Sequence, residues 1–237
     1  MDTFSLAFAL KQFPQLLKAL PVTLLITVVS MAVGLALGTA IALCRMYRVP
    51  VLGQLAHVYV SFIRGTPLLV QIYVLFYGTP VLLDWLESQW GWPLPADGVP
   101  PLLYACFALS INTAAYQSEI IRSALGAVDS GQMEAAYSVG MSTRQALLRI
   151  VIPQALVSAL PNFGNTFIGL VKGTSLAFSV KVVEIMAVAK IEAGDGYRYL
   201  EMYLNASILY WIICFGFERA FSVMEKRLSR HERAPVH

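Results

Sequence analysis

Long apolar runs alternate with short polar segments along this chain, and five of the runs are long enough to cross a membrane. A helix needs about 20 mostly apolar residues to cross the hydrocarbon core of a bilayer. The runs are Leu20–Cys44, Leu55–Leu83, Pro101–Leu125, Pro153–Val183 and Leu204–Met224. The second is interrupted at Arg64-Gly65-Thr66-Pro67, where the proline is expected to bend or break a helix. The pattern predicts an all-α integral membrane protein with five transmembrane helices.

The segment before the first run has a different pattern. Phe4–Leu17 is mostly apolar, with Lys11 inside the segment and Lys18 directly after it. This pattern is typical of a short helix that lies at a membrane surface. The predicted organisation is therefore an interfacial segment at 1–19, a transmembrane domain at 20–225 and a tail at 226–237.

Composition supports the membrane class. Of the 237 residues, 57% are hydrophobic and 13% are charged, whereas soluble domains carry about 25% charged residues. The net charge of +3 is small and spread along the chain, which argues against nucleic acid as a partner. Cysteines and histidines show no metal-ligand spacing, so no metal site is expected; they are Cys44, Cys106, Cys214, His57, His231 and His237. No phosphate-binding Gly-x-x-x-x-Gly-Lys loop is present.

The distribution of basic residues predicts the orientation, because Lys and Arg are enriched in cytoplasmic loops. One side holds nine of them, namely Arg45, Arg48, Arg122, Arg144, Arg149, Lys226, Arg227, Arg230 and Arg233, and the other holds Lys11, Lys18, Lys190 and Arg198. We therefore expect the N-terminus outside and the C-terminus in the cytoplasm. The predicted outer loop Asp84–Pro100 carries Trp85, Trp90 and Trp92, as in an interfacial aromatic belt.

A polar, small-residue segment separates the third and fourth runs, at about 127–152, and is expected on the cytoplasmic side. Asp129-Ser130-Gly131 can begin a helix that runs from Gln132 to about Val139, and Gly140 can end it in a left-handed conformation. Ser142 can begin a second helix. The residues leave two interpretations open: a docking surface for a cytoplasmic protein, or an amphipathic connector that only covers the helix bundle.

The motifs in this segment resemble those of a known family. Glu134-Ala135-Ala136, Gly140 and Ile150-Val151-Ile152-Pro153 resemble the EAA motif of the membrane subunits of ABC importers. From about Leu17 to Leu228, the chain resembles the polar amino-acid permeases for histidine, glutamine, arginine and cystine, and most of all the cystine permeases. The shared motifs are Arg64-Gly65-Thr66-Pro67-Leu68, Asn112-Thr113-Ala114-Ala115-Tyr116, Gly131-Gln132-x-Glu134-Ala135-Ala136, Pro153-Gln154-Ala155 and Lys172-Gly173-Thr174-Ser175-Leu176.

The resemblance implies the type I ABC importer permease fold in a bacterial cytoplasmic membrane. It also implies a second permease copy or a sister permease, cytoplasmic ATPase subunits that bind ATP and Mg, and an extracytoplasmic solute-binding protein. This chain would translocate a polar amino acid, such as L-cystine, without a catalytic site of its own. The segment at 127–152 would couple the ATPase to the spans through Gly131, Glu134, Ala135, Ala136, Gly140 and Pro153, with Glu134 anchoring it by hydrogen bonds.

The substrate path is expected on two helical faces. Asn112, Tyr116 and Glu119 share one face of the third run, and the fourth carries Asn162, Asn165, Lys172, Thr174 and Ser175. Lys172 and Glu119 could bind the carboxylate and the ammonium of an amino acid. Gly173 departs from the family pattern, which has Asp or Glu there, and this leaves Lys172 without an adjacent acidic partner.

Each of these residues also has a structural interpretation. The asparagines could form hydrogen bonds between helices, Glu119 could pair with Arg122, and Lys172 could pair with Glu184. Arg64, before Pro67, could bond the carbonyl groups that the proline leaves free, or it could act as a gate. At the level of function, a secondary transporter or a channel subunit without ATP coupling remains the alternative, although no inverted repeat is evident.

Overall fold

The computed structural model describes residues 4–91 and 98–229, and every regular element within these ranges is helical. The α-helices are α1 (Leu6–Met46), α2 (Leu52–Gly65), α3 (Leu68–Trp90), α4 (Pro101–Gly126), α5 (Ser130–Ser138), α6 (Thr143–Ala146), α7 (Ile152–Gly173), α8 (Ile185–Ala193) and α9 (Tyr199–Ser229). A π-helical segment, Leu147–Val151, joins α6 to α7, and 3-10 segments lie at Thr174–Val180 and Asp195–Tyr197.

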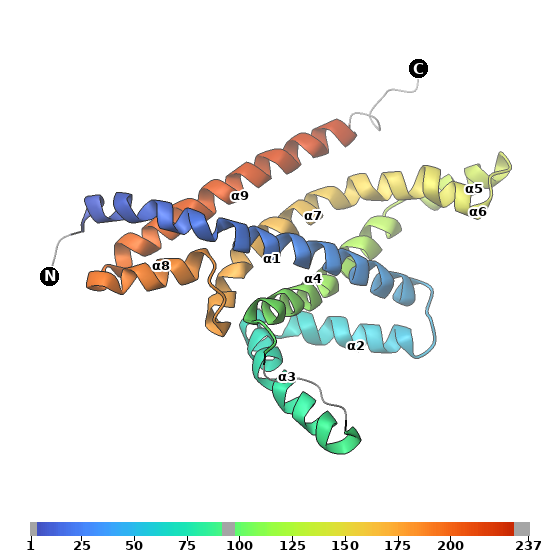
Figure 1. Ribbon diagram of the computed structural model, residues 1–237. Helices are drawn as coiled ribbons and strands as arrows, with labels where there is room; N and C mark the ends of the chain where they lie inside the picture. Colours follow the sequence, from blue (N-terminus) through green and yellow to red (C-terminus); the bar gives the residue numbers. More distant parts are fainter. Residues whose placement is uncertain (1–3, 92–97, 230–237) are drawn as a thin grey trace.

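Helices α1 and α4 form the central pair of the bundle and lie side by side (Figure 1). Small residues on α1 let the two backbones approach. A Cβ atom added at Gly34 would lie 2.7 Å from the Thr113 side chain, and one added at Gly38 would lie 2.9 Å from the Ala114 carbonyl oxygen. Close approach through small residues is the usual way in which membrane helices gain packing contacts.

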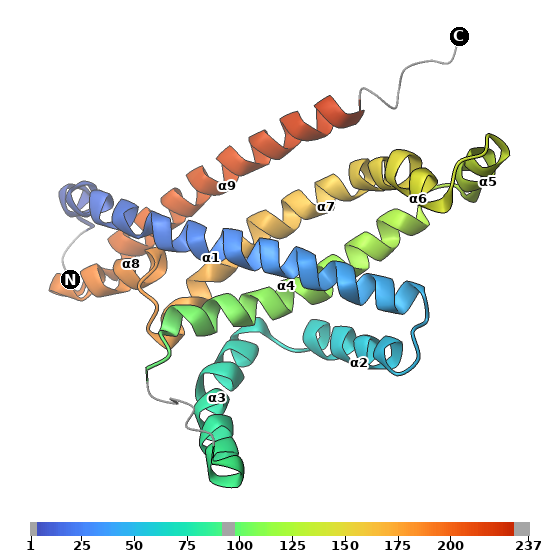
Figure 2. The same ribbon diagram turned by 45° about the vertical axis from the view of Figure 1, so that its right-hand side comes forward.

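The second apolar run is broken where the sequence predicts. Helix α2 ends at Gly65 and α3 begins at Leu68, with Thr66 and Pro67 extended between them. The change of direction carries α3 away from the other helices (Figures 1 and 2). Helix α3 consequently buries only Gln71 and Ile72 within the chain.

The N-terminal segment is part of a longer helix. Helix α1 is continuous for 41 residues and contains Pro14 and Pro21, so the boundary at 19–20 does not separate two elements. Its first turns pack against α8 and α9 around Leu16, Ile185 and Met202. The Asn205 side chain donates a hydrogen bond of 2.7 Å to the Ala9 carbonyl oxygen. Its location at a membrane surface stays a prediction.

Four helical stretches in the described ranges, rather than the expected five, are long and apolar enough to cross a membrane. They are Leu6–Met46, Leu68–Trp90, Thr143–Val180 and Tyr199–Leu228. The expected span at Pro101–Leu125 is a helix, α4, but it is not apolar enough to count among these stretches. Its polar residues explain the difference: Ser110, Thr113, Gln117 and Ser118 are buried by neighbouring helices. A helix enclosed by protein does not need the apolar surface that lipid requires.

Two predicted polar segments are partly helical. Helix α3 continues to Trp90 and so includes the first part of the predicted outer loop, whereas Trp92 lies outside the described residues. Helix α9 continues to Ser229 and so includes the first part of the predicted tail; residues 230–237, with Arg230 and Arg233, lie outside the described ranges. The orientation across the membrane stays a prediction.

Candidate functional site

The short helices α5 and α6 form a tip beyond the ends of α4 and α7 (Figure 2). Local hydrogen bonds fix both helix starts. The Asp129 carboxylate accepts a hydrogen bond of 2.7 Å from the Gly131 amide, and Ser142 forms a reciprocal capping box with Gln145. These contacts satisfy amide groups that the first turn of a helix leaves free. The predicted caps are confirmed, and α5 begins two residues before the predicted position.

Gly140 turns the chain between α5 and α6. Its φ angle is +79°, in the left-handed region, as predicted. The Gly140 amide donates to the Tyr137 carbonyl at 2.9 Å, and the Met141 amide donates to the Ala136 carbonyl at 3.0 Å. This pair of bonds is a Schellman motif, which ends a helix tightly. The turn therefore depends on a conformation that glycine adopts without strain.

The segment after the turn is helical from the predicted cap at Ser142, but it is continuous with the fourth span. Helix α6, the π-helical segment and α7 run on without a break, so the fourth span begins near Thr143 instead of Pro153. Pro153 has no amide hydrogen, and its ring would crowd the carbonyl four residues earlier in a regular α-helix. The wider π turn over Leu147–Val151 admits the proline, and the Ile152 amide bonds the Leu147 carbonyl. Movement of the tip can therefore pass directly into α7.

Small and apolar side chains cover the tip. Ala136 is 2% exposed and packs inward, whereas Ala135 lies on the outer surface. Tyr137 is 47% exposed and Val139 is 77% exposed, so both side chains lie on the outer surface of the tip. The motif found in the sequence did not include these two residues. The position of Val139 directly before the turn at Gly140 could have indicated that its side chain is exposed. We call Ser130–Met141 the coupling tip, after the role that the sequence predicts for it.

The expected anchoring role of Glu134 is not present within the described chain. Its side chain is exposed, and only its backbone carbonyl takes part in a hydrogen bond, from the Ser138 hydroxyl at 3.0 Å. The carboxylate has no hydrogen-bond or ion-pair partner among the described residues. The reason is geometric: the caps of α5 and α6 are already formed by Asp129, Ser142 and Gln145.

A cavity of about 330 Å³ lies at the break between α2 and α3, against α4 and α7. Two residues of the predicted substrate path, Asn112 and Tyr116, line it. Its other walls come from the break and from helices α3, α4 and α7: Thr66, Leu68, Thr113, Thr166, Gly169, Leu170 and Gly173. The structure therefore brings together part of the predicted path in a pocket with neutral polar groups. We call it the central pocket.

The other predicted path residues lie elsewhere. Asn162, Asn165 and Lys172 are exposed on α7, Ser175 is half-buried in the 3-10 turn after it, and none lines the central pocket. Thr174 is fully buried, and its hydroxyl donates to the Val171 carbonyl at 2.7 Å. The change from α-helix to 3-10 helix at Thr174 rotates Thr174 and Ser175 away from the face that simple helical spacing predicts.

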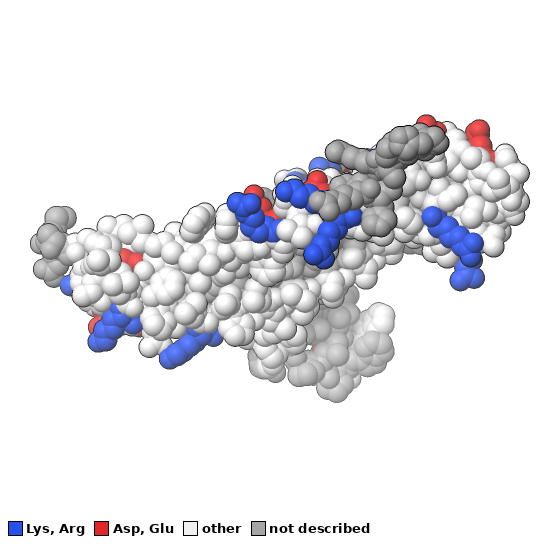
Figure 3. Space-filling view, turned by 90° about the horizontal axis from the view of Figure 1, so that it is seen from above, with Lys and Arg blue, Asp and Glu red and all other residues white. Residues whose placement is uncertain are grey.

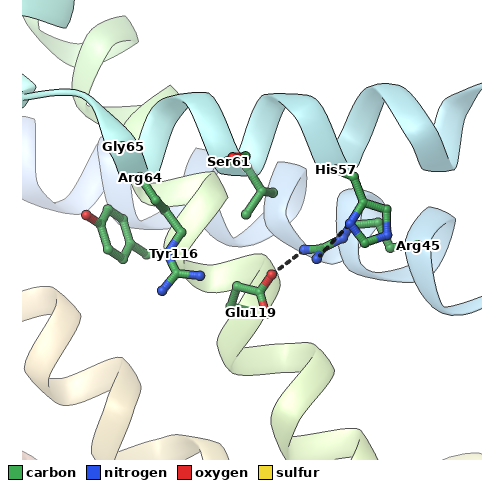
Figure 4. Close-up of a pocket in the computed structure, with 8 residues that line it drawn as sticks. Arg45, His57, Ser61, Arg64, Gly65, Tyr116 and Glu119 are labelled. Atoms are coloured by element: carbon green, nitrogen blue, oxygen red, sulfur yellow. Dashed lines mark hydrogen bonds and ion pairs between the residues drawn. The ribbon is translucent and has the colours of Figure 1, made fainter.

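Glu119 lies in a different pocket, at the junction of α1, α2 and α4 (Figure 4). Its carboxylate forms ion pairs with Arg45 and, at 2.7 Å, with Arg122. The pairing with Arg122 is one of the predicted alternatives and is confirmed. Because two guanidinium groups already bind Glu119, the suggested pairing of Lys172 and Glu119 around an amino acid does not occur in this structure.

Arg64 does not bond the carbonyl groups near Pro67. Its guanidinium lies over the Tyr116 ring, 5.6 Å from the ring centre (Figure 4). Gln71 takes that role instead: its side-chain amide donates to the Ile63 carbonyl at 2.8 Å and to the Thr66 carbonyl at 3.1 Å. Its oxygen accepts a 2.9 Å bond from Asn112. Gln71, which sequence reasoning missed, thus ties the helix break to the wall of the central pocket.

Glu184 pairs with Tyr210 and not with Lys172. The Tyr210 hydroxyl donates to the carboxylate at 2.6 Å, and the Ala187 amide donates to it at 2.9 Å. Burial raises the pKa of the Glu184 carboxyl, although these hydrogen bonds act in the opposite direction. Glu184 therefore starts α8 and fixes it against α9, and Lys172 has no ion-pair partner among the described residues.

Comparison with known proteins identifies the family. A family described as "Binding-protein-dependent transport system inner membrane component" matches residues 32–230, which is most of the chain. The chain belongs to this family. The family and the long apolar helices together indicate that this chain is a multi-pass membrane protein.

Characterised family members are similar over nearly the full length. The L-cystine transport system permease protein TcyL of Bacillus subtilis is 42% identical over 219 residues, which cover 92% of this chain and 89% of TcyL. The nopaline transport system permease protein NocM of Agrobacterium fabrum is 38% identical, over 96% of this chain and 93% of NocM.

Solved structures show the same fold. A chain from the crystal structure of an amino acid ABC transporter with histidines superposes with a TM-score of 0.81 at 32% identity, covering 95% of this chain and all of that chain. A chain from inward-facing MetNI methionine ABC transporter crystals gives a TM-score of 0.71 at 18% identity, which shows fold likeness alone. The type I ABC importer permease fold is therefore confirmed.

Gly173, at the position where the sequence resemblance leads us to expect Asp or Glu, lines the central pocket. A Cβ atom added there would meet only the Leu68 side chain, at 3.6 Å. The space for a longer side chain is thus present in this chain, but the carboxylate is absent from it.

Proposed function

We propose that this chain is the membrane subunit of an ATP-driven importer for a polar amino acid. The coupling tip carries the proposal, because it exposes a small-residue helix and an apolar side chain, Val139, beyond the membrane-spanning helices. A partner protein that covers this surface would bury apolar area, which is the usual driving force for association. The continuous path from α6 into α7 gives such a partner a rigid connection to the spans.

The partners follow from this assignment. Cytoplasmic ATPase subunits would bind ATP and Mg and grip the coupling tip, through Ala135, Ala136 and Gly140 together with Val139. An extracytoplasmic solute-binding protein would deliver the substrate, and a second copy or a sister permease would complete the pathway in a bacterial cytoplasmic membrane. ATP-driven closure of the ATPase pair would then move the two tips together and rotate the spans as rigid bodies.

The central pocket supports a substrate whose side chain carries no net charge; in cystine the second ammonium and the second carboxylate balance each other. Its lining contains asparagine, threonine and tyrosine but no Lys, Arg, Asp or Glu among the described residues. A cationic side chain would lack the acidic partner that Gly173 replaces. Cystine, which the similar TcyL transports by its name, fits these neutral polar walls better than arginine does. Asn112, held by Gln71, would present its carbonyl oxygen to the substrate.

ATP dependence tests the proposal against the alternative of a secondary transporter or channel. The chain is reconstituted in vesicles with its ATPase and solute-binding protein, and uptake of labelled cystine is measured. We expect uptake that needs ATP and falls to the level of empty vesicles when the ATPase subunit is left out. Uptake that persists without the ATPase, or that follows an ion gradient, would favour the alternative.

A further inference from the structure

Helices α7 and α9 enclose a groove near one end of the bundle. The two helices are in contact at their middle, where the Phe167 ring lies 4.7 Å from the Phe217 ring and 5.7 Å from the Phe221 ring. From there they diverge toward the start of α7 and the end of α9 (Figures 1 and 2). A cavity of about 790 Å³ fills the widening space, and we call it the α7–α9 groove.

The groove is apolar inside and basic at its mouth. Its inner walls are formed by apolar side chains, namely Leu156, Val157, Leu160, Phe163 and Leu228. One arginine stands on each side of the mouth: Arg149 from the π-helical segment and Arg227 from the last turn of α9. Seen from above, basic side chains gather over the end of α9 and at the end of the molecule that holds the coupling tip (Figure 3).

Neither arginine has an ion-pair partner among residues 4–91 and 98–229. The ion pairs among the described residues involve Arg45, Arg122 and Arg198, and no hydrogen bond or ion pair joins Arg149 or Arg227 to a described residue. Arg227 is next to the last residue of the candidate span Tyr199–Leu228, and Arg149 lies in the second turn of Thr143–Val180, so we expect the mouth at the level of lipid headgroups. An apolar groove that opens to the bilayer and carries paired positive charge there matches an amphiphile with an anionic head.

We propose that the α7–α9 groove binds an anionic phospholipid. Arg149 and Arg227 would donate charge-assisted hydrogen bonds to its phosphate and headgroup oxygens. One acyl chain would lie along Leu156, Leu160 and Phe163. Basic pockets between membrane helices on the cytoplasmic side are suited to anionic headgroups, and the predicted orientation places the groove on that side. Because the π turn that carries Arg149 links the coupling tip to α7, a bound lipid would brace the segment that transmits movement.

The test counts bound lipids on the purified full-length chain in its membrane complex. Native mass spectrometry compares palmitoyl-oleoyl phosphatidylglycerol with the zwitterionic phosphatidylcholine of the same chains. We expect the wild type to retain phosphatidylglycerol preferentially. The double variant Arg149→Gln/Arg227→Gln should lower that preference about thirtyfold, since each basic residue near an anionic surface contributes about 1 kcal/mol and tenfold corresponds to about 1.4 kcal/mol.

A matched control removes the same charge outside the groove. Arg144→Gln/Lys226→Gln takes one positive charge from each of the same two regions, but neither residue lines the groove. This variant should keep the preference for phosphatidylglycerol. If it loses the preference as fully as the groove variant does, a diffuse basic surface binds the lipid and the proposal is overturned.

A third variant tests the acyl-chain part without changing charge. Leu160→Trp adds bulk inside the groove and should displace the lipid although both arginines remain. Unchanged binding in this variant would contradict the proposal. The same holds if cysteines placed at Arg149 or Arg227 cross-link efficiently to a second copy of the chain in lipid vesicles, because a protein would then occupy the groove. None of these outcomes depends on which substrate is transported.

Discussion

Gly140→Asp should lower ATP-driven uptake at least tenfold while the chain remains inserted and assembled. The backbone cost is modest, because a non-glycine residue in the left-handed region costs about 1 kcal/mol and aspartate tolerates it better than most. The larger effect comes from charge. An added Cβ atom at Gly140 meets no atom within 4 Å, so the carboxylate would project from the coupling tip. A partner closing on the tip would have to bury that charge without a counter-ion.

Two controls separate charge from backbone strain. Gly140→Asn has nearly the same shape and the same tolerance of the left-handed region, but no charge, so it should retain most of the uptake. Gly126→Asp adds the same charge at the end of α4, where an added Cβ atom also meets no neighbour, and should retain uptake as well. Uptake and ATP hydrolysis are measured together in vesicles. Normal uptake by a stably assembled Gly140→Asp complex would contradict the coupling role.

Gly38→Leu should prevent the chain from folding, seen as loss of the monodisperse protein after detergent extraction. The Cβ atom alone would stand 2.9 Å from the Ala114 carbonyl oxygen and 3.1 Å from the Ser118 amide nitrogen. Backbone atoms of α4 cannot move aside without separating the central helix pair. Overpacking a core commonly costs about 1–3 kcal/mol, and a whole leucine against backbone lies at or beyond the upper end.

Gly216→Leu is the matched control for this substitution. Gly216 lies within α9, and an added Cβ atom there meets no atom within 4 Å. Leucine also has a higher helix propensity than glycine, by roughly 1 kcal/mol. This variant should therefore be extracted in normal amounts. Equal recovery of the Gly38→Leu and Gly216→Leu proteins would show that the α1–α4 contact is not as close as described.

Features that depend on neighbouring residues could be predicted from the sequence. The caps at Asp129 and Ser142, the left-handed Gly140 and the helix break at Thr66-Pro67 each follow from local backbone chemistry. In each case one side chain, or the lack of one, decides which backbone groups within a few residues can form a hydrogen bond. The same reasoning predicted the helices on both sides of Gly140, although it began the fourth span at Pro153, whereas the helix from Thr143 continues into that span.

Features that depend on tertiary packing could not be predicted in this way. Glu119 was grouped with Lys172 by helical spacing, but Arg45, from a helix distant in sequence, neutralises it instead. Gln71 was not singled out, because its role depends on the carbonyl groups that the break at Pro67 exposes. Ser118 of α4 was not singled out either, because its burial depends on the close approach of Gly38 on α1. In all three cases the partner lies far away along the chain.

The assignment as an importer subunit depends most on whether an ATPase grips the coupling tip. The direct measurement is co-purification of the ATPase subunit with the tagged chain, comparing the wild type with Val139→Glu. Val139 is 77% exposed, so glutamate should leave the fold intact and place a charge in the contact. Tyr197→Glu, at another largely exposed residue between two candidate spans and away from the tip, serves as the control. The account predicts that the ATPase is retained by the wild type and by Tyr197→Glu and is lost from Val139→Glu. Equal retention by all three proteins would contradict it.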